Sequence, residues 1–393
     1  MKYVFPTYNR FPLDIVAGED WHLTDDNNKT YLDFTSGIGV CNFGYSNELI
    51  QKSVAHQLTK IWHTSNLYES HLQDEVAHQL VGTEDRLVYF CNSGTEANEA
   101  ALKLARKYTG RSAVLSFNNS FHGRTYGAMS LTGNPAIQTG FAPLVPGISF
   151  ANYNDPAAIE QIKPDLAAVI LEVIQGEGGV YAAKAQWLKA VAKACHEQQV
   201  LLIIDEVQTG IGRTGKRFAY QYYELDPDIV TVAKGLGNGL PIGAMIGKSN
   251  LAVAFGPGSH GSTFGGNKIA LASATAVLQQ LTPEFLAGVQ TKATQVWQTL
   301  ENEIITLPVV TGVTGLGLMI GIHLDETVAV GDVIEELQQN GLLTLSAKHN
   351  TLRLLPPLVM DAADLMLGLQ KIEQVLSSKT QKQRKVSYEP FSK

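Results

Sequence analysis

The sequence predicts an α/β protein with a large domain built on a mainly parallel β-sheet and a smaller α+β domain. Short apolar runs alternate with longer amphipathic stretches through the middle of the chain, as in a parallel sheet covered by helices. After Phe264 the pattern changes to long helical stretches separated by short strands. A chain of 393 residues is also longer than a single domain with one compact core usually is, which indicates two or three domains.

The expected elements follow this pattern in order along the chain. Residues 21–34 indicate a hairpin with a polar turn at 25–29. Strands are expected at 86–91, 112–117, 167–174, 200–204 and 229–232, with helices at 96–108 and 185–198. Helices are then expected at 268–280, 283–305, 332–340 and 362–376, with strands at 309–313 and 316–324 and a strand pair within 342–355. The predicted division is 1–50, joining the small domain; 51–275, the large domain; 276–376, the small domain; and 377–393, a polar tail.

Composition limits the classes of partner. Hydrophobic residues make up 45% and charged residues 17% of the chain, which is typical of a soluble globular enzyme. The formal charge is -7, from 30 basic and 37 acidic residues, so no basic field attracts nucleic acid or an anionic membrane. The basic tail is interpreted as a solvated terminus.

The cysteines and the N-terminus indicate a cytoplasmic protein. Cys41, Cys91 and Cys195 form neither a disulfide framework nor a metal-binding pair, so no metal is expected and a reducing compartment fits. Residues 1–16 lack the apolar core of a signal peptide, and no stretch of about 18 apolar residues occurs.

An apolar strand, Val200 to Ile204, ends in the carboxylate of Asp205. Ligands of open α/β sheets bind at the carboxyl ends of strands, so Asp205 is expected at the floor of a site. A carboxylate buried there needs a cation or several hydrogen-bond donors. The alternative is an Asp that caps the next turn.

The same strand resembles the acidic strand of ATPases, and Gly210 to Arg217 (Gly-Ile-Gly-Arg-Thr-Gly-Lys-Arg) falls one residue short of a P-loop. A working P-loop follows the first strand of its unit, opens a helix and carries Ser or Thr after its lysine. Here Arg217 takes that position, the acidic strand comes before the glycines, and aromatic residues follow. A nucleotide-binding module is therefore the weaker hypothesis.

Two further segments carry candidate chemistry. Ser93 to Glu96 has capping-box spacing at the start of a helix. Backbone N–H groups, Gly94 and the Thr95 hydroxyl would form a phosphate-binding site there. The alternative is a helix end that binds only water. Asp228 to Val232 is a strand that delivers Lys234 into a glycine-rich turn. Burial near positive charge would lower the pKa of this lysine, as Schiff-base chemistry requires.

Five motifs in the same order resemble the class III aminotransferases. They are Ser-Gly-Thr-Glu-Ala-Asn at 93–98, Phe-His-Gly-Arg-Thr at 121–125, Asp-Glu-Val-Gln-Thr-Gly at 205–210, Ala-Lys-Gly at 233–235 and Gly-Ser-Thr-Phe-Gly-Gly-Asn at 261–267. The resemblance runs from about Asn9 to Leu376. It implies a fold type I enzyme that depends on pyridoxal 5'-phosphate (PLP) and works as a homodimer.

The resemblance also implies the cofactor-binding residues. Lys234 would carry the cofactor, and Asp205 would pair with the protonated pyridine nitrogen, which makes the ring an electron sink. The remaining cofactor contacts would be Phe121 and Val207 on the two ring faces, Gln208 at the 3-hydroxyl, Gly94 and Thr95 at the phosphate, and Thr263 reaching across from the second subunit.

The same resemblance implies how substrates are held. Arg124 matches the residue that binds the substrate α-carboxylate, and Ser262 lies in the segment that crosses from the other subunit. Arg353 matches an arginine that binds a carboxylate of glutamate or 2-oxoglutarate, and Glu177 matches its partner when a substrate reacting at its far end is bound. Without the family, Arg353 would be interpreted as a surface ion pair.

Within the family, the chain resembles members that act on N2-acetylornithine. Enzymes for free ornithine carry a tyrosine near the position of Ile38, whereas Ser36 to Val40 is apolar here. The implied reaction moves the terminal amino group of N2-acetyl-L-ornithine to 2-oxoglutarate, in arginine biosynthesis. The alternatives are another ω-aminotransferase (for succinylornithine, ornithine, 4-aminobutyrate or lysine-type amines) and a PLP aminomutase or decarboxylase. Gly44 to Asn47 departs from the family pattern, and we expect it to affect an entrance loop.

Overall fold

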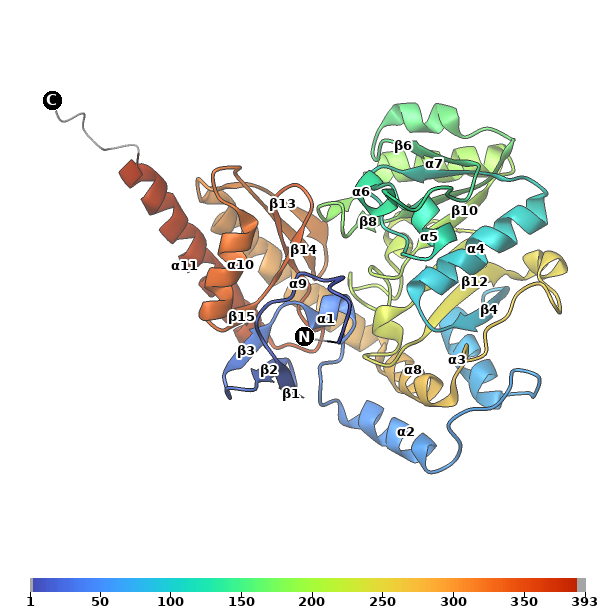
Figure 1. Cartoon of the computed structure of the whole chain (residues 1–393), viewed down its shortest axis with the longest axis horizontal. Helices are drawn as coiled ribbons and strands as arrows, with labels where there is room; N and C mark the ends of the chain where they lie inside the picture. The colour runs from blue at the N-terminus through green and yellow to red at the C-terminus, as the bar shows by residue number, and fades with distance from the viewer. Residues whose placement is uncertain (1–2, 387–393) are drawn as a thin grey trace.

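The computed structural model describes residues 3–386 and contains two lobes (Figure 1). The larger lobe is built on a seven-stranded sheet with the order β4-β12-β11-β10-β7-β5-β6. Its strands are β4 (Arg86–Cys91), β5 (Ala113–Phe117), β6 (Ile148–Ala151), β7 (Leu166–Glu172), β10 (Leu201–Asp205), β11 (Ile229–Val232) and β12 (Gly243–Lys248). Only β12 runs antiparallel to its neighbours, which confirms the expected mainly parallel sheet.

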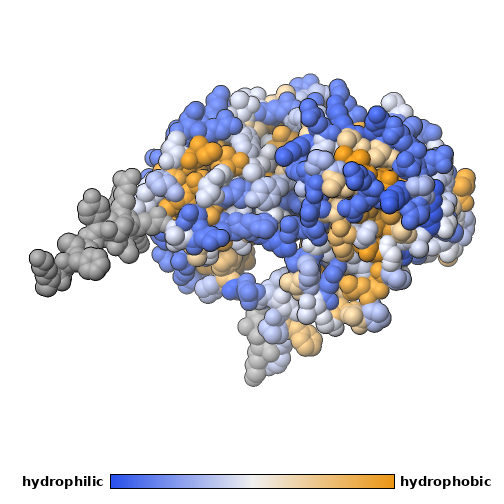
Figure 2. Space-filling model, turned by 90° about the horizontal axis from the view of Figure 1, so that it is seen from above, coloured by the Kyte–Doolittle hydropathy of each residue, from blue (hydrophilic) through white to orange (hydrophobic). Residues whose placement is uncertain are grey.

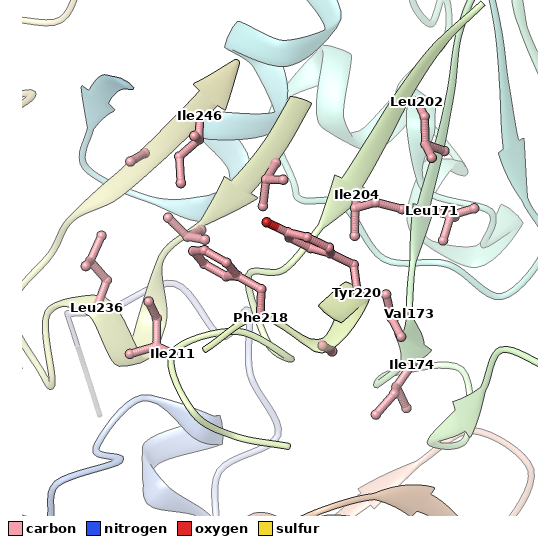
Figure 3. Packing of buried hydrophobic residues seen from close by; sticks show 14 of the residues in the cluster. Leu171, Val173, Ile174, Leu202, Ile204, Ile211, Phe218, Tyr220, Leu236 and Ile246 are labelled. Carbon is pink, nitrogen blue, oxygen red and sulfur yellow. The ribbon is translucent and has the colours of Figure 1, made fainter. Parts of the chain in front are cut away.

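Helices cover both faces of this sheet, which explains why its central strands are apolar at every position. On β10, Ile203 packs in one hydrophobic cluster with α4 (Gly94–Thr109), and Ile204 packs in another with α7 (Ala185–Glu197). Figure 3 shows the cluster around Ile204, where Leu171 and Ile246 come from β7 and β12 and Phe218 and Tyr220 cover them. Alternating side chains thus enter opposite layers, as expected for a doubly covered sheet.

The other helical elements of this lobe lie before, between and after the strands. They are α2 (Glu48–Leu58), α3 (His71–Val81), α5 (Tyr126–Leu131), α6 (Pro135–Gln138), η1 (Pro156–Gln161), η2 (Ala219–Tyr223), η3 (Lys234–Leu236), η4 (Ser249–Ala254) and α8 (Lys268–Gln280). A short hairpin, β8 (Ile174–Gln175) and β9 (Tyr181–Ala182), follows β7. The strands β6 and β12 and this hairpin were not expected from the sequence.

The smaller lobe has its own hydrophobic core, formed largely by the C-terminal part of the chain. An antiparallel sheet with the order β13-β14-β17-β16 comprises β13 (Val310–Leu316), β14 (Met319–Leu324), β16 (Leu345–Ala347) and β17 (Thr351–Leu354). The helices α9 (Pro283–Asn302), η5 (Ile304–Thr306), α10 (Val330–Gln339) and α11 (Ala362–Val386) belong to the same part of the chain (Figure 1). The break expected before Leu316 falls instead at Gly317, which adopts φ 61°.

The N-terminal strands lie against the C-terminal part of the chain. A second sheet orders β1 (Ile15–Glu19), β2 (His22–Asp25), β3 (Thr30–Asp33) and β15 (Leu342–Leu343), and β3 pairs in parallel with β15. The short α1 (Ser36–Gly39) follows. The expected hairpin at 21–34 is therefore present, while the domain boundaries at 50 and 275 stay a prediction.

The C-terminal helix continues past Leu376, where the sequence had been expected to end it, to Val386. The predicted polar tail therefore begins in helix, and its last residues, 387–393, lie outside the described residues. Within residues 3–386, none of the helices combines the length and apolarity needed to span a bilayer.

Candidate active site

The carboxyl ends of the central strands, together with Val40 from the N-terminal part of the chain, surround a cavity of about 430 Å³. Most of the predicted site residues line it. Its walls include Gly94, Thr95, Phe121, Arg124, Asp205, Val207, Gln208 and Lys234. Residues from four of the five sequence motifs are thus brought together where the topology of an α/β sheet places ligands.

Asp205 is 3% exposed and is held by a set of oriented hydrogen-bond donors. Its Oδ2 accepts hydrogen bonds from Asn98 Nδ2 (2.8 Å) and lies 2.8 Å from His122 Nδ1. Its Oδ1 accepts a bond from Val207 N at 2.9 Å, and the Thr231 hydroxyl donates to Asn98 Oδ1 at 2.8 Å. These contacts fix the carboxylate at the cavity floor, as the sequence predicted, although it also caps the turn at Val207.

Lys234 enters the same cavity from the start of η3 with a left-handed backbone, φ 45°. Non-glycine residues adopt this conformation at a cost and cluster at functional sites. Burial lowers the pKa of the Lys234 amine, and the nearby Arg353 lowers it further, while Glu177 and Asp205 oppose this. The amine is therefore more readily deprotonated than an ordinary lysine, which favours nucleophilic and proton-transfer chemistry.

The start of α4 is the segment that was predicted to form a cup for an anion. Ser93 Oγ caps the helix by accepting a bond from Glu96 N at 3.3 Å. The reciprocal bond differs from the expected capping box, because Glu96 Oε2 accepts from Asn92 N, one residue earlier, at 2.5 Å. The first amides of the helix and the Thr95 hydroxyl lie at the cavity wall, where the helix dipole favours negative charge.

Three side chains shape the middle of the cavity. Phe121 and Val207 both line it, and a Cβ on Gly94 would lie 2.6 Å from Val207 Cγ1, so only glycine fits there. Gln208 is 7% exposed, and its Oε1 has no hydrogen-bond partner among the described residues. A buried acceptor without a donor in a cavity is the feature that a ligand hydroxyl would satisfy.

Two arginines were predicted to bind substrate carboxylates. Arg124 lines the cavity, whereas Arg353 and Glu177 are not among its lining residues but lie close enough to influence the charge of Lys234. Arg124 is exposed, and its guanidinium lies 5.6 Å from the centre of the Phe121 ring. Arg353, on β17, is 3% exposed, and its Nη1 donates to Glu177 Oε1 in an ion pair. Burial raises the pKa of Glu177, but the charge and hydrogen bond of Arg353, the charge of Lys234 and a hydrogen bond from Gln208 together outweigh it, and the pKa is lowered. The pair joins the small lobe to the large one beside Lys234.

Ser262 and Thr263 do not line this cavity in the single chain. They lie beside a separate hollow with Asn66 and Gln73, and Ser262 Oγ accepts a bond from Asn92 Nδ2 at 3.1 Å. Thr263 is exposed. Their predicted reach to a site of a second subunit stays a prediction.

Two buried residues of the site were missed at the sequence level. Glu172 ends β7 in register with Asp205 on β10, and its Oε2 accepts a bond from Phe121 N at 3.0 Å. Burial raises the pKa of Glu172 to about 7. An apolar strand that ends in a carboxylate was the available signal, as for Asp205. His122 lay within a quoted motif, but its contact with Asp205 joins residues far apart in the sequence.

The segment that imitates a P-loop has a different structure. Residues 210–217 form successive turns, with φ of 53° at Ile211, 86° at Gly212 and 89° at Gly215, and the short η2 follows. Arg217 Nη1 donates to Gln79 O, and Arg213 is fully buried. The segment therefore serves as internal packing between the lobes.

Comparison with known proteins gives one family. The profile described as Aminotransferase class-III matches residues 3–376. An acetylornithine aminotransferase of Lactiplantibacillus plantarum is 65% identical over 97% of this chain and 98% of that protein. The structure of an N-acetylornithine aminotransferase from Stenotrophomonas maltophilia superimposes with a TM-score of 0.82 and 32% identity over 94% of this chain and 97% of that one.

A second solved structure bears on the cofactor. An ornithine aminotransferase from Toxoplasma gondii, with PLP at partial occupancy in its active site, superimposes with a TM-score of 0.91 and 29% identity over 97% of this chain and 94% of that one. The cavity described above fits the same group, since it offers an amine, a facing carboxylate, an anion cup and the unpartnered Gln208 Oε1. With the family profile spanning nearly its whole length, the chain belongs to the PLP-dependent class III aminotransferases.

Proposed function

We propose that the protein transfers the terminal amino group of N2-acetyl-L-ornithine to 2-oxoglutarate, giving N-acetyl-L-glutamate 5-semialdehyde and L-glutamate in arginine biosynthesis. The observation that carries the reaction type is one cavity that holds the desolvated amine of Lys234, the carboxylate of Asp205 and the anion cup of α4. The choice of amino donor is supported by the names of the relatives at 65% and 32% identity.

The residues around the cavity have distinct tasks toward PLP. Gly94 and Thr95 would hold its phosphate, Phe121 and Val207 its ring faces, Gln208 its ring hydroxyl, Asp205 its pyridine nitrogen and Lys234 its reactive carbon. Bound PLP supplies an electron sink for the electron pair that the substrate's reacting carbon keeps when it loses a proton. Asp205 would face the ring nitrogen, because the hydrogen bonds from Asn98 Nδ2 and Val207 N orient its carboxylate in the cavity.

Lys234 would move the proton. Its lowered pKa would let the neutral amine take a proton from the reacting carbon of the substrate and return it during the same turnover. Positioned acid–base groups of this kind contribute about 10² to 10⁴ in rate. We therefore expect Lys234→Ala to bind PLP and to lose nearly all turnover, and turnover near that of the wild type would refute the assignment.

Substrate carboxylates would be bound by the two arginines. Arg124 would hold the α-carboxylate of N2-acetylornithine, since it is exposed at the cavity that contains Lys234. Arg353 would release Glu177 and bind a carboxylate of 2-oxoglutarate or glutamate, because a planar guanidinium matches either carboxylate. One cavity would then accept both substrates in turn.

A homodimer would complete each site. Ser262 and Thr263 lie outside the cavity of their own chain, and large apolar side chains near this segment are exposed, including Trp62 (63%), Leu67 (93%) and Phe264 (59%). Hydrophobic patches also interrupt the hydrophilic surface in Figure 2. Apolar area of this kind is typical of a subunit interface. The three free cysteines support a cytoplasmic location.

Half-reaction spectroscopy tests the proposal. The holoenzyme is mixed separately with N2-acetylornithine, succinylornithine, ornithine and 4-aminobutyrate, and the absorption band of the cofactor is followed in time. We expect N2-acetylornithine to change the band fastest and 2-oxoglutarate to restore it with release of one glutamate per cycle. A faster reaction with another amine would identify a different ω-aminotransferase, and turnover without glutamate would identify a mutase or decarboxylase.

A further inference from the structure

Arg213 is a fully buried cation to which the proposed function gives no role. It lies in the Gly210–Arg217 segment and is 0% exposed. Burial lowers the pKa of its guanidinium to about 9, and the charge of Asp33 opposes this. Within the part of the chain that the structure describes, no ion pair joins Arg213 to a carboxylate. A buried charge without an ionic partner lowers stability, so its retention calls for another explanation.

The guanidinium joins three segments that are distant in sequence. Its Nη1 donates to Leu318 O at 3.2 Å and to Pro356 O at 2.5 Å, and its Nη2 donates to Asn42 Oδ1 at 2.6 Å. The backbone of Arg213 adds a fourth contact, because its carbonyl accepts a bond from Leu318 N at 3.2 Å. A fork of donors with fixed geometry sets the relative positions of all three acceptors.

Two of these acceptors, Leu318 and Pro356, lie next to the strands that position Arg353. Pro356 is the second residue after β17, the strand that carries Arg353. Leu318 lies in the turn that opens β14, and β14 pairs with β17 so that Gly321 lies opposite Arg353. Arg213 therefore contacts both strands that position the guanidinium of Arg353, whose charge acts on Lys234.

The third acceptor, Asn42, lies next to the turn that carries Lys234. Asn42 Nδ2 donates to Ile211 O at 3.0 Å, and a Cβ on Gly235 would overlap this same amide nitrogen. Figure 3 shows Ile211 beside Leu236 of η3, in the buried cluster beneath the turn that carries Lys234. Asn42 and Ile211 thus pack directly against that turn.

We propose that Arg213 is a positioning residue that sets the separation of Lys234 and Arg353, and thereby the length of dicarboxylate that the site accepts. The inference rests on the proposed function, in which Arg353 binds a carboxylate of 2-oxoglutarate. Amine donors that bind through Arg124 depend less on it, because Arg124 belongs to the motif at 121–125 on the large lobe.

The experiment compares Arg213→Lys and Asn42→Ala with the wild-type holoenzyme. Arg213→Lys keeps the charge but loses the fork, and Asn42→Ala removes one acceptor and leaves the guanidinium in place. Arg86→Lys is the matched control, because Arg86 is also buried (9% exposed) but pairs with Glu84 and Asp226 at the far end of β4. Calorimetry gives the Kd of glutarate and of the longer adipate, neither of which can react.

In Arg213→Lys we expect the Kd of glutarate to rise about tenfold or more and the preference for glutarate over adipate to shrink by a similar factor, since a small displacement of a binding group costs up to about 10². Asn42→Ala should shift both quantities in the same direction. The rate of the N2-acetylornithine half-reaction in Arg213→Lys should fall by a smaller factor than the affinity for glutarate, because this substrate does not depend on Arg353. Arg86→Lys should lower the thermal midpoint and leave the length preference unchanged.

The two claims fail in different ways. If Arg353→Met binds glutarate as well as wild type, the carboxylate role of Arg353 in the proposed function is wrong. If Arg353→Met binds it poorly while Arg213→Lys and Asn42→Ala keep the wild-type preference for glutarate over adipate, only the positioning role is wrong. An equal loss in both half-reactions with an unchanged length preference would also overturn it, because it would indicate a general structural role.

Discussion

Glu206 is a buried acid whose replacement should raise stability at neutral and alkaline pH. It follows Asp205 directly but is 0% exposed, and its carboxylate accepts bonds from Thr209 Oγ1 (2.6 Å) and Tyr220 N (2.8 Å). Burial raises its pKa from 4.5 to about 7 despite these donors. Glu206→Gln removes the charge but keeps the shape, because the amide can accept from Tyr220 N and donate to the Thr209 hydroxyl.

The sign and size of the effect follow from the pKa. The folded protein binds the Glu206 proton more tightly than the unfolded chain does, so the free energy of unfolding falls as pH rises from about 4.5 to 7. Above pH 7 the ionised carboxylate costs the folded state about 3 kcal/mol. With about 2.1 cal/mol/K of unfolding entropy per residue, this corresponds to roughly 4 °C in thermal midpoint.

Differential scanning calorimetry between pH 5 and pH 8.5 measures this effect. Glu206→Gln and wild type should have similar midpoints at pH 5, and the variant should exceed wild type by a few degrees at pH 8.5. The exposed Glu301 of α9 provides the control, and Glu301→Gln should follow the wild-type profile at every pH. A Glu206→Gln difference that is constant with pH, or that grows toward acid, would refute the reasoning.

Three further substitutions test the site. Asp205→Asn should lower kcat by about 10² or more, because the oriented carboxylate is lost. Steady-state assays with saturating PLP measure kcat, and an unchanged value would show that Asp205 has no catalytic role. Gly94→Ala should weaken PLP binding in an equilibrium titration, since its Cβ would lie 2.6 Å from Val207, whereas Gly256→Ala, with open space around it, should bind normally. Glu177→Gln should lower the KM for 2-oxoglutarate by up to about fivefold. In the wild type, Arg353 must first break its partly exposed ion pair with Glu177, which is worth up to about 1 kcal/mol, and the variant has no such pair to break. A raised KM would contradict the exchange of partners at Arg353.

Features encoded in short stretches of sequence could be predicted. The apolar strand that ends in Asp205, the turn that carries Lys234 and the capped start of α4 each depend on neighbouring residues, and the structure has all three. Their meeting in one cavity followed from topology, since parallel strands align their carboxyl ends.

Features decided by distant contacts could not be predicted. The strand β12 contains two glycines, Gly243 and Gly247, which weaken its strand pattern, and it becomes a strand because it fits antiparallel between β11 and β4. Arg213 lies among polar and glycine residues that indicate a surface loop, yet acceptors from three remote segments enclose it. His122 likewise gains its contact with Asp205 only in the folded chain.

The pairing of β3 with β15 has a consequence for biosynthesis. Leu32 lies opposite Leu342, so the N-terminal sheet is completed by a strand that leaves the ribosome near the end of translation. The seven-stranded sheet uses only residues from 86 to 248 and can assemble earlier. The strands β1 to β3 can pair with one another early, but the free edge of β3 stays open to other chains and to chaperones until nearly the whole polypeptide has emerged.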